Sequence, residues 1–314
     1  MTLDPQVRDL FDRAAALGLP PYEQQTPQEA RASYLEVVRA RRGPHVVPEP
    51  VAAVEERTIP GPAGPLRARL FTPPGPGPHP VLLYFHGGGW VIGDRDTHDD
   101  QARALCARGG ALVVSVDYRL APEDPFPAAL DDVRAATTWA AGHAEALGAD
   151  PQRLGVAGDS AGANLAAAVC LAARDVGGPP IAAQILIYPV VDATLDQPSV
   201  VELAQGYGLT LATMRWFVDQ YLPDAATHRD PLASPLAAGD LSGLPPAVVV
   251  TAGYDLLHDQ GDAYAERLRE AGGDVVLRQH PGLVHGFLGM APQVAAAAEA
   301  VDLLCADVRR ALAT

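Results

Sequence analysis

The chain has 314 residues and a formal net charge of −15, with 48% hydrophobic and 19% charged residues, which is the composition of a globular protein able to bury a large core. The acidic balance argues against a nucleic-acid partner, since binding to phosphates needs clustered basic side chains. All 23 basic residues are arginine, so a Schiff-base lysine, a P-loop lysine and a Ser–Lys dyad are excluded.

Two helices are predicted before the first strand. Residues 5–18 place their apolar side chains on one face, as an amphipathic helix does. Thr26 and Glu29 have the spacing of a capping box, with Pro27 at the first helical position, so a second helix begins there. These helices could form a lid over a cleft or an N-terminal packing arm, and both interpretations stay open. Residues 43–64 are rich in proline and glycine and predict a connection.

From residue 66 onward, short apolar runs alternate with helical patterns. The predicted strands are 66–70, 81–85, 111–116, 154–157, 181–188, 247–251 and 275–279. The predicted helices are 98–108, 127–142, 165–173, 210–222, 258–271 and 292–312. Strands that alternate with helices predict an α/β fold with a mostly parallel sheet, here of about eight strands, covered by helices on both faces. Residues 192–235 are irregular apart from their one helix.

Residues Gly158 to Gly162 fit the pattern G-x-S-x-G where a predicted strand meets a predicted helix. A strand that turns directly into a helix holds the residue at the turn in a strained conformation. The flanking positions must be small because backbone segments pass closely there. Such a turn exposes the hydroxyl of Ser160 above the sheet. It also places the backbone N–H of Ala161 at a helix N-terminus, where a negative charge is stabilised.

Two further polar residues follow predicted strands and complete the chain order serine, aspartate, histidine. Asp255 follows the strand at 247–251, and His285 follows the strand at 275–279. The carboxyl ends of parallel strands meet at one edge of a sheet, where active sites form. A serine needs a base with a pKa near neutrality, which suits histidine, and an acid fixes the tautomer of that base. We therefore predict Ser160 as nucleophile, His285 as base and Asp255 as acid.

Other residues compete for these roles. His280 lies close to His285, but the pattern places it at a strand end ahead of a Pro-Gly turn. Asp259 and Asp262 compete with Asp255 for the role of the acid. They belong to the following predicted helix, where carboxylates more often cap or solvate the helix. We therefore keep Asp255 and His285.

A glycine-rich loop follows the predicted strand at 81–85 and reads His86-Gly87-Gly88-Gly89-Trp90. Without Cβ atoms, its glycines let backbone N–H groups approach a carbonyl oxygen closely. Together with the N–H of Ala161, the loop supplies donors for an oxyanion. Loss of one such donor typically costs about 2.7–4 kcal/mol in the transition state.

Cofactor and metal patterns are missing from the sequence. No G-x-G-x-x-G follows a strand, and no H-E-x-x-H or C-x-x-C occurs, so no cofactor and no metal is predicted. His98, Asp99 and Asp100 could suggest a metal site. Adjacent residues on a helix point apart, however, so we interpret this stretch as a solvated helix start.

Cysteine usage and hydropathy predict a cytoplasmic protein. The three cysteines lie far apart, so no disulfide framework is expected. The N-terminus lacks the charged and apolar regions of a signal peptide, and no apolar run approaches the ~18 residues of a membrane-spanning helix. We expect no contact with a membrane or with nucleic acid.

Four ordered motifs resemble those of the hormone-sensitive-lipase-like esterases, a bacterial family of α/β-hydrolases. The motifs are His86-Gly87-Gly88-Gly89-Trp90, Asp117-Tyr118-Arg119-Leu120-Ala121-Pro122-Glu123, Gly158-Asp159-Ser160-Ala161-Gly162-Ala163-Asn164 and Val284-His285-Gly286-Phe287. The resemblance implies an α/β-hydrolase fold with a helical cap. The cap would comprise residues 1–45, with a contribution from 192–235, and the catalytic domain would comprise residues 46–314.

The resemblance also implies hydrolysis of carboxylic esters with short to medium acyl chains through an acyl-enzyme, without a cofactor. It assigns the same catalytic triad, and it assigns the oxyanion hole to the N–H groups of Gly88, Gly89 and Ala161. In this family His86 shapes the oxyanion loop and is not the base. Asp159 is similar to the residue that marks the Gly-Asp-Ser-Ala-Gly branch of the family.

The substrate pocket is the least readable part of the sequence. Candidates for lining it are Trp90, Asp159, Tyr207, Leu209, Trp216 and Phe217. The large side chains among them are as often plain core. The same triad would also serve a lactonase, an amidase or a deacetylase, and a non-catalytic small-molecule receptor on the same fold is a further alternative. The expected partner is a small-molecule ester, and the resemblance implies a possible homodimer.

Overall fold

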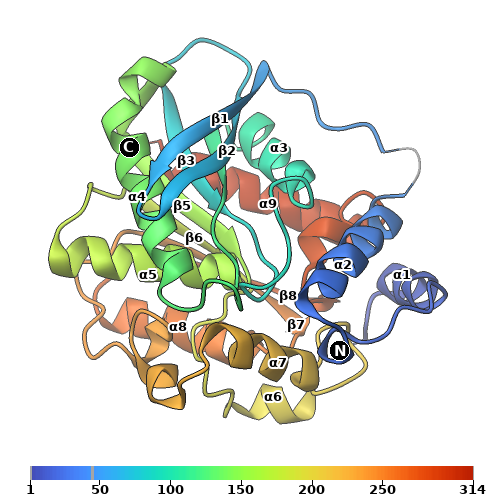
Figure 1. The fold of residues 1–314 in the computed structure, drawn as a ribbon. Coiled ribbons are helices and arrows are strands. Elements are labelled where there is room, and N and C mark those ends of the chain that lie inside the picture. The colour runs from blue at the N-terminus through green and yellow to red at the C-terminus, as the bar shows by residue number, and fades with distance from the viewer. Residues whose placement is uncertain (1, 44–45, 314) are drawn as a thin grey trace.

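The structure is a computed structural model that describes residues 2–43 and 46–313. Within these residues, one eight-stranded sheet has the strand order β1-β2-β4-β3-β5-β6-β7-β8 (Figure 1). Its strands are β1 Ala53–Gly61, β2 Gly64–Thr72, β3 His79–Phe85, β4 Leu112–Asp117, β5 Ala149–Asp159, β6 Ala183–Ile187, β7 Ala247–Tyr254 and β8 Val275–Val284. Strands β3 to β8 run parallel, whereas β1 and β2 are antiparallel to their neighbours. The predicted mostly parallel sheet of about eight strands is confirmed.

Helices cover both faces of this sheet. They are α1 Pro5–Ala15, α2 Pro27–Arg42, α3 Asp99–Ala107, α4 Ala128–His143, α5 Ala161–Val176, α6 Pro198–Glu202, α7 Leu211–Tyr221, α8 His258–Glu270 and α9 Ala295–Ala311. Side chains of α4, α5 and α8 share one hydrophobic cluster with one face of the sheet. Side chains of α3 and α9 share the other cluster with the opposite face. Strand β3 shows why both faces are apolar: Leu83 and Phe85 point into the first cluster, and Leu82 and Tyr84 into the second.

One predicted connection is wrong, because residues 53–61 of the 43–64 stretch form the edge strand β1. This strand pairs with β2 in antiparallel register, with Ile59 opposite Leu66. Most of its side chains are exposed, and Ile59 is its buried residue. A strand that buries so little has no alternating apolar pattern, and its proline and glycine resemble turn residues.

Three strands run further than their apolar runs indicated. Strand β5 extends to Asp159, β7 to Tyr254 and β8 to Val284. The strands therefore end directly before the three residues predicted to form the triad. This places the polar residues at the carboxyl edge of the sheet without a long intervening loop.

The N-terminal segment folds as the capping signals predict. The side chain of Thr26 accepts from the N–H of Glu29, and the Glu29 carboxylate accepts from the N–H of Thr26, so the capping box of α2 is confirmed. Figure 1 shows α1 and α2 side by side on the right-hand side of the molecule, whereas α6 and α7 lie at the bottom. The predicted boundary between residues 45 and 46 falls at residues 44–45, which lie outside the described residues.

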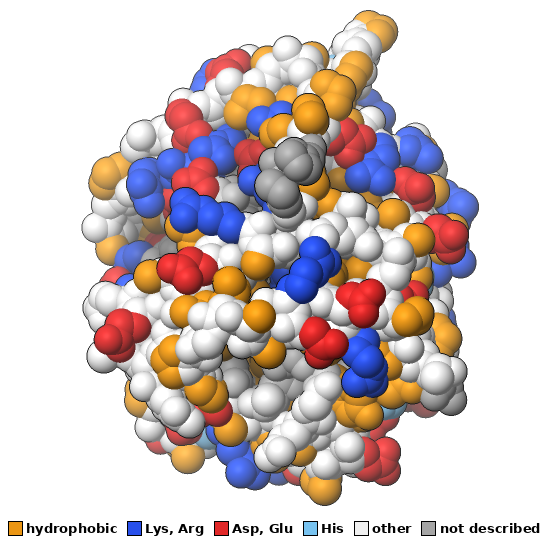
Figure 2. All heavy atoms as spheres, turned by 90° about the vertical axis from the view of Figure 1, so that its right-hand side faces the viewer, with side chains coloured by type: hydrophobic (Ala, Val, Ile, Leu, Met, Phe, Trp, Pro, Cys, Tyr) orange, Lys and Arg blue, Asp and Glu red, His pale blue; other side chains and the backbone are white. Residues whose placement is uncertain are grey.

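Surface and composition features follow from the same fold. None of the helices in residues 2–43 and 46–313 is long and apolar enough to span a membrane. Figure 2 shows the face over α1 and α2, where acidic and basic side chains are interspersed rather than separated into patches of one sign. All three cysteines, Cys106, Cys170 and Cys305, are buried. Across the described part of the chain, no three histidine, cysteine, aspartate or glutamate side chains gather as a metal site.

Candidate active site

The turn between β5 and α5 carries Ser160 in a strained backbone conformation. Its φ is 56° and its ψ is −117°, which places a non-glycine residue in a region that L-residues rarely adopt. A Cβ atom on Gly158 would lie 2.3 Å from the carbonyl carbon of Gly162. A Cβ atom on Gly162 would lie 1.9 Å from the carbonyl oxygen of Phe85. The glycines are therefore required by close backbone approach, as the sequence pattern indicates.

Ser160, His285 and Asp255 form a continuous hydrogen-bonded chain. His285 Nε2 lies 2.9 Å from Ser160 Oγ, and His285 Nδ1 lies 2.7 Å from Asp255 Oδ2. The other carboxylate oxygen of Asp255 accepts from the N–H of Leu257 at 2.9 Å, which fixes the orientation of the carboxylate. The ring of His285 packs against Tyr188 with centroids 4.7 Å apart. This geometry lets the histidine take the serine proton while the aspartate holds the opposite ring nitrogen.

The competing residues have other partners. His280 lies inside β8, with its ring 5.4 Å from that of Phe287. Asp262 accepts from the hydroxyl of Thr251 at 2.9 Å, and Asp259 accepts from the N–H of Ser199 at 2.7 Å. These carboxylates therefore hold neighbouring segments together and do not contact the His285 ring.

The glycine-rich loop approaches the serine with free backbone donors. Gly88 and Gly89 have φ values of 120° and 57°, and a Cβ atom on either would overlap Ile92 or Phe217. Within the described residues, the N–H groups of Gly88, Gly89 and Ala161 donate no hydrogen bond. Ala161 is the first residue of α5, where helical N–H groups have no partner within the helix.

Asp159 fixes the start of this loop from the position beside the nucleophile. Its carboxylate accepts from the N–H of Gly87 at 2.9 Å and from the hydroxyl of Tyr84 at 2.7 Å. His98 Nε2 lies 3.6 Å from the same carboxylate. Burial raises the pKa of Asp159, but the charge and hydrogen bonds of His98 and Tyr84 outweigh burial and hold that pKa below its usual range. A buried carboxylate thus ties the oxyanion loop to the turn that carries Ser160.

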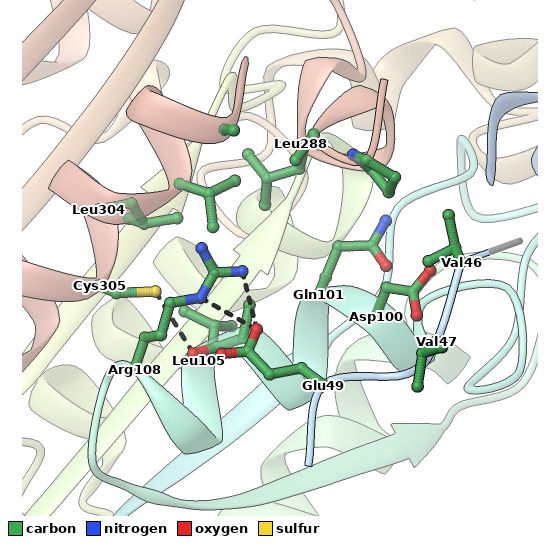
Figure 3. Close-up of a pocket in the computed structure, with 15 residues that line it drawn as sticks. Val46, Val47, Glu49, Asp100, Gln101, Leu105, Arg108, Leu288, Leu304 and Cys305 are labelled. Carbon is green, nitrogen blue, oxygen red and sulfur yellow. Dashed lines mark hydrogen bonds and ion pairs between the residues drawn. The ribbon is translucent and has the colours of Figure 1, made fainter. Parts of the chain in front are cut away.

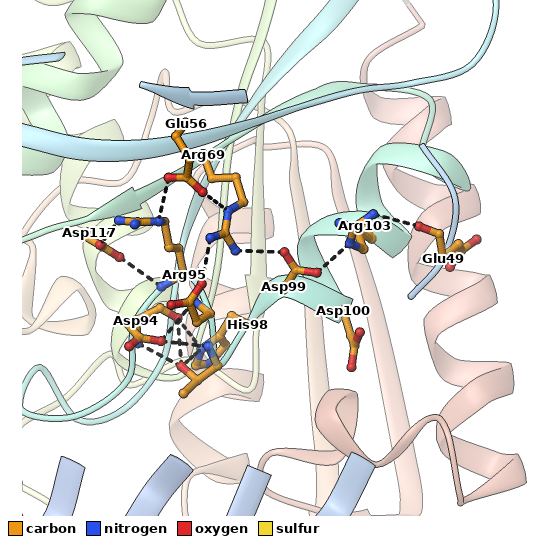
Figure 4. Close-up of polar contacts among 12 residues, drawn as sticks. Glu49, Glu56, Arg69, Asp94, Arg95, His98, Asp99, Asp100, Arg103 and Asp117 are labelled. Carbon is orange, nitrogen blue, oxygen red and sulfur yellow. Dashed lines mark hydrogen bonds and ion pairs between the residues drawn. The ribbon is translucent and has the colours of Figure 1, made fainter. Parts of the chain in front are cut away.

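His98 corrects the interpretation of residues 98–100 as a solvated helix start. Its side chain is buried, and Nδ1 lies 3.0 Å from the hydroxyl of Thr97. Burial lowers the pKa of His98, but the charge of Asp159 outweighs burial and raises that pKa above its usual value. Figure 4 shows the surrounding polar contacts, in which Arg69 binds Asp99 at 3.0 Å. His98 is thus buried, and Asp99 and Asp100 are half-buried and paired with arginines from distant segments, Arg69 on β2 and Arg42 on α2.

His86 is part of the same buried cluster. Its ring stacks on Tyr118 with centroids 4.3 Å apart, and its Nδ1 lies 2.8 Å from the carbonyl oxygen of Gly87. Burial and the neighbouring charge of His98 lower the pKa of His86. A neutral imidazole that contacts the loop backbone shapes the loop and does not reach Ser160.

A cavity of about 120 Å³ opens at Ser160 and His285. Its lining residues are Tyr22, Tyr34, Arg41, Gly88, Gly89, Ile92, Asp159, Ser160, Gly208, Leu209, Thr213, Met214, Phe217, His285 and Gly286. Of the sequence candidates, Asp159, Leu209 and Phe217 line it. Trp90, Tyr207 and Trp216 do not, since their rings pack on Tyr221, Tyr254 and Phe217 respectively.

Sequence reasoning missed Tyr22, Tyr34 and Arg41. These side chains come from the N-terminal segment and lie far from the catalytic motifs in the chain. The position of Arg41 in the last turn of α2 resembles an ordinary basic helix end, so no local signal marked it.

A second cavity, of about 280 Å³, lies between α3, α9 and residues 46–49 (Figure 3). Across it, Arg108 pairs with Glu49 at 2.8 Å. The thiol of Cys305 donates to the carbonyl oxygen of Ala104, and burial raises the pKa of that thiol to about 12. The thiol of Cys305 is therefore not an activated nucleophile, although this cavity is larger than the cavity at Ser160.

A parallel sheet with a serine on a strained strand-to-helix turn defines the α/β hydrolase class. A protein family described as alpha/beta hydrolase fold matches residues 82–289 of this chain. The carboxylesterase NlhH of Mycobacterium tuberculosis is 46% identical over 293 residues, which cover 90% of this chain and 91% of that protein. The carboxylic ester hydrolase LipN of the same organism is 42% identical over 296 residues, which cover 92% and 78% respectively.

Solved structures agree with this relationship. The ester-hydrolase EH1AB1 from the metagenome of Lake Arreo, complexed with a derivative of bipyridine phosphonate, superposes with a TM-score of 0.93. It shares 42% sequence identity, and the match covers 100% of both chains. The chain therefore belongs to the α/β hydrolase fold family, within the hormone-sensitive-lipase-like group of esterases.

Proposed function

We propose that this protein is a carboxylesterase that hydrolyses esters with short to medium acyl chains through a covalent acyl-enzyme. The observation that carries the proposal is the hydrogen-bonded chain from Ser160 Oγ through His285 to Asp255 at the floor of an open cavity. Relatives named as carboxylesterases support ester hydrolysis as the reaction. A triad with all three members present also argues against a non-catalytic receptor.

In the first half of the reaction, Ser160 Oγ attacks the ester carbonyl carbon while His285 Nε2 takes the hydroxyl proton. Asp255 holds Nδ1–H and stabilises the imidazolium that forms. The free N–H groups of Gly88, Gly89 and Ala161 donate to the oxyanion of the tetrahedral intermediate. When the intermediate collapses, the C–O bond to the alcohol breaks, and His285 gives its proton to the leaving alkoxide.

In the second half, water replaces the alcohol. His285 takes a proton from the water as its oxygen attacks the acyl carbon of the Ser160 ester, and the same backbone donors bind the new oxyanion. Collapse releases the carboxylic acid and returns the proton to Ser160 Oγ.

We propose that the described part of residues 1–45, together with residues 192–235, forms the cap of this enzyme. The first segment contributes Tyr22, Tyr34 and Arg41 to the cavity, and the second contributes Leu209 and Met214, among others. The cap side chains therefore shape the space beside the nucleophile. A cavity of about 120 Å³ suits short acyl groups better than long ones.

The test measures turnover of p-nitrophenyl acetate, butyrate, octanoate and palmitate. We expect the wild type to be most active on the shorter esters, and Ser160→Ala to lose activity by at least about 10⁴-fold. Ser242→Ala, which removes an exposed hydroxyl, serves as the matched control and keeps wild-type rates. Equal rates for wild type and Ser160→Ala would refute the proposal, and a maximum at palmitate would refute the preference for shorter chains.

A cytoplasmic location and a homodimer stay predictions from the sequence. Size-exclusion chromatography with light scattering measures the oligomeric state. Cell fractionation measures the location.

A further inference from the structure

The wall of the catalytic cavity that comes from the N-terminal segment differs in chemistry from the rest. Tyr22, Tyr34 and Arg41 lie there, and Arg41 is the arginine among the lining residues. The apolar lining side chains from elsewhere in the chain are Ile92, Leu209, Met214 and Phe217. The cavity therefore combines apolar side chains with one guanidinium group.

The guanidinium of Arg41 lies beside the proposed catalytic base. Its Nη1 atom is 3.5 Å from the position that a Cβ atom on Gly286 would take, and Gly286 directly follows His285. The same side chain lines an adjoining cavity of about 40 Å³, together with Asp159 and Tyr188. Arg41 is half-buried, and its positive charge borders both cavities.

This guanidinium has no hydrogen-bond or ion-pair partner among the described residues. Within the part of the chain that the structure describes, Arg41 forms no side-chain hydrogen bond or ion pair, whereas the adjacent Arg42 is paired with Asp100. Removing a charge from water without a partner costs free energy. In a chain with a net charge of −15, most arginines find a carboxylate, so a partly buried unpaired arginine points to a ligand that carries one.

The carboxylates near the cavity are already engaged. Asp159 accepts from the N–H of Gly87 and faces His98, and Glu23 accepts from the hydroxyl of Thr213 at 2.8 Å. Neither is paired with Arg41 among the described residues. The charge of Arg41 is therefore available to a bound molecule.

We propose that the enzyme prefers esters that also carry a carboxylate or a similar anionic group, and that Arg41 binds this group. The proposal rests on the esterase activity proposed above and names the substrate class of the same site. The ester carbonyl meets Ser160, and the apolar part of the substrate packs against side chains such as Phe217. The planar guanidinium offers two parallel N–H donors that match the geometry of a carboxylate.

The kinetic test compares anionic esters with neutral esters of the same shape. Monoethyl succinate, glutarate and adipate are paired with the corresponding ethyl ester amides, which places the anion on the acyl side. The pair para-butanoyloxybenzoate and para-butanoyloxybenzamide places it on the alcohol side. In at least one pair we expect the wild type to show at least about a tenfold higher kcat/KM for the anion.

Variants of Arg41 test whether this residue causes the preference for anionic esters. Arg41→Gln is expected to abolish the ratio of kcat/KM between anionic and neutral esters, and Arg41→Lys to retain part of it because it keeps the charge. Arg39→Gln removes the same charge from an exposed position of the same helix and keeps the wild-type ratio. An unchanged ratio in Arg41→Gln, or no preference in the wild type for any pair, overturns the inference.

Binding to Ser160→Ala separates this inference from the proposed activity. Calorimetry with monoethyl glutarate and its amide is expected to show at least about tenfold tighter binding of the anion, lost in the Ser160→Ala/Arg41→Gln double variant. If no ester is turned over but the anion binds through Arg41, the proposed activity fails and the anion site stands. If esters are turned over without any Arg41-dependent binding or preference, the inference alone fails.

Discussion

His285–Asp255 and His98–Asp159 are both histidine–aspartate pairs at the catalytic cavity, but their surroundings differ. In the first pair the two side chains are 2.7 Å apart, and the far ring nitrogen meets the hydroxyl of Ser160. In the second they are 3.6 Å apart. There the far ring nitrogen lies among Thr97 and the Asp94 backbone, away from any nucleophile.

The difference shows what a histidine–aspartate pair needs for acid–base chemistry. The side chain of His285 is 13% exposed and borders the cavity, so it can exchange a proton with a substrate or with water. The side chain of His98 is 2% exposed and holds the carboxylate that binds the N–H of Gly87. In the proposed reaction, the first pair moves protons, and the second pair holds the loop that carries the proposed oxyanion donors.

Among the changes that distinguish the two histidine–aspartate pairs, Asp255→Asn is expected to cause the largest loss of kcat. The amide cannot fix the tautomer of His285 or stabilise its protonated form, so kcat for p-nitrophenyl butyrate should fall by about 10⁴-fold. Asp262→Asn is the matched control, because Asp262 binds Thr251 and Gln279 outside the cavity. A loss of less than about tenfold in Asp255→Asn would remove Asp255 from the proposed triad.

A smaller loss is expected for the same change in the second pair, Asp159→Asn. The amide keeps the shape of the side chain but removes the charge that faces His98 and weakens the hold on the N–H of Gly87. Displacement of the oxyanion loop should lower kcat by about 10²-fold with little change in KM, since donors act on the transition state. Circular dichroism checks that the variant is folded. A loss as large as that of Asp255→Asn would mean that Asp159 takes part in proton transfer.

The first pair could be predicted from the sequence, because its signals are local. An apolar run marks each strand, and Ser160, Asp255 and His285 follow directly after strands β5, β7 and β8. The parallel arrangement then brings these strand ends to one edge. The spacing of the small residues around Ser160 adds a steric requirement that the structure bears out.

The second pair and the cavity wall could not be predicted, because they depend on contacts between distant segments. In the sequence, His98 resembles a polar residue at the start of a helix. Only the fold shows that it faces Asp159 at the end of strand β5. Trp90 was predicted to line the pocket, but in the structure its ring stacks on that of Tyr221. Strand β1 was missed for a related reason: its pairing with β2 stabilises it, and its own side chains bury little.

His98→Gln is expected to have the smallest effect on the rate. Its main effect is expected on the free energy of unfolding. The pKa of His98 is raised in the folded protein, so its contribution to stability is complete below the unfolded value of about 6.5 and is lost as the pH rises through the folded value. The free energy of unfolding of the wild type should therefore exceed that of His98→Gln by about 2 kcal/mol near pH 6. This excess should shrink toward pH 9.

Urea denaturation across this pH range measures the difference between the two proteins. This difference includes the effect of His98 on the pKa values of Asp159 and His86. The charged groups that face His98, which are Asp159, Asp94 and His86, are present in both. The pKa of His86 is lowered, so its own contribution has the opposite sign and is lost as the pH falls. His143→Gln, at an exposed histidine, is the control for the substitution of a histidine by glutamine. A stability gap for His98→Gln that widens with rising pH would show that His98 is neutral in the folded protein and that Asp159 is held by its hydrogen bonds alone.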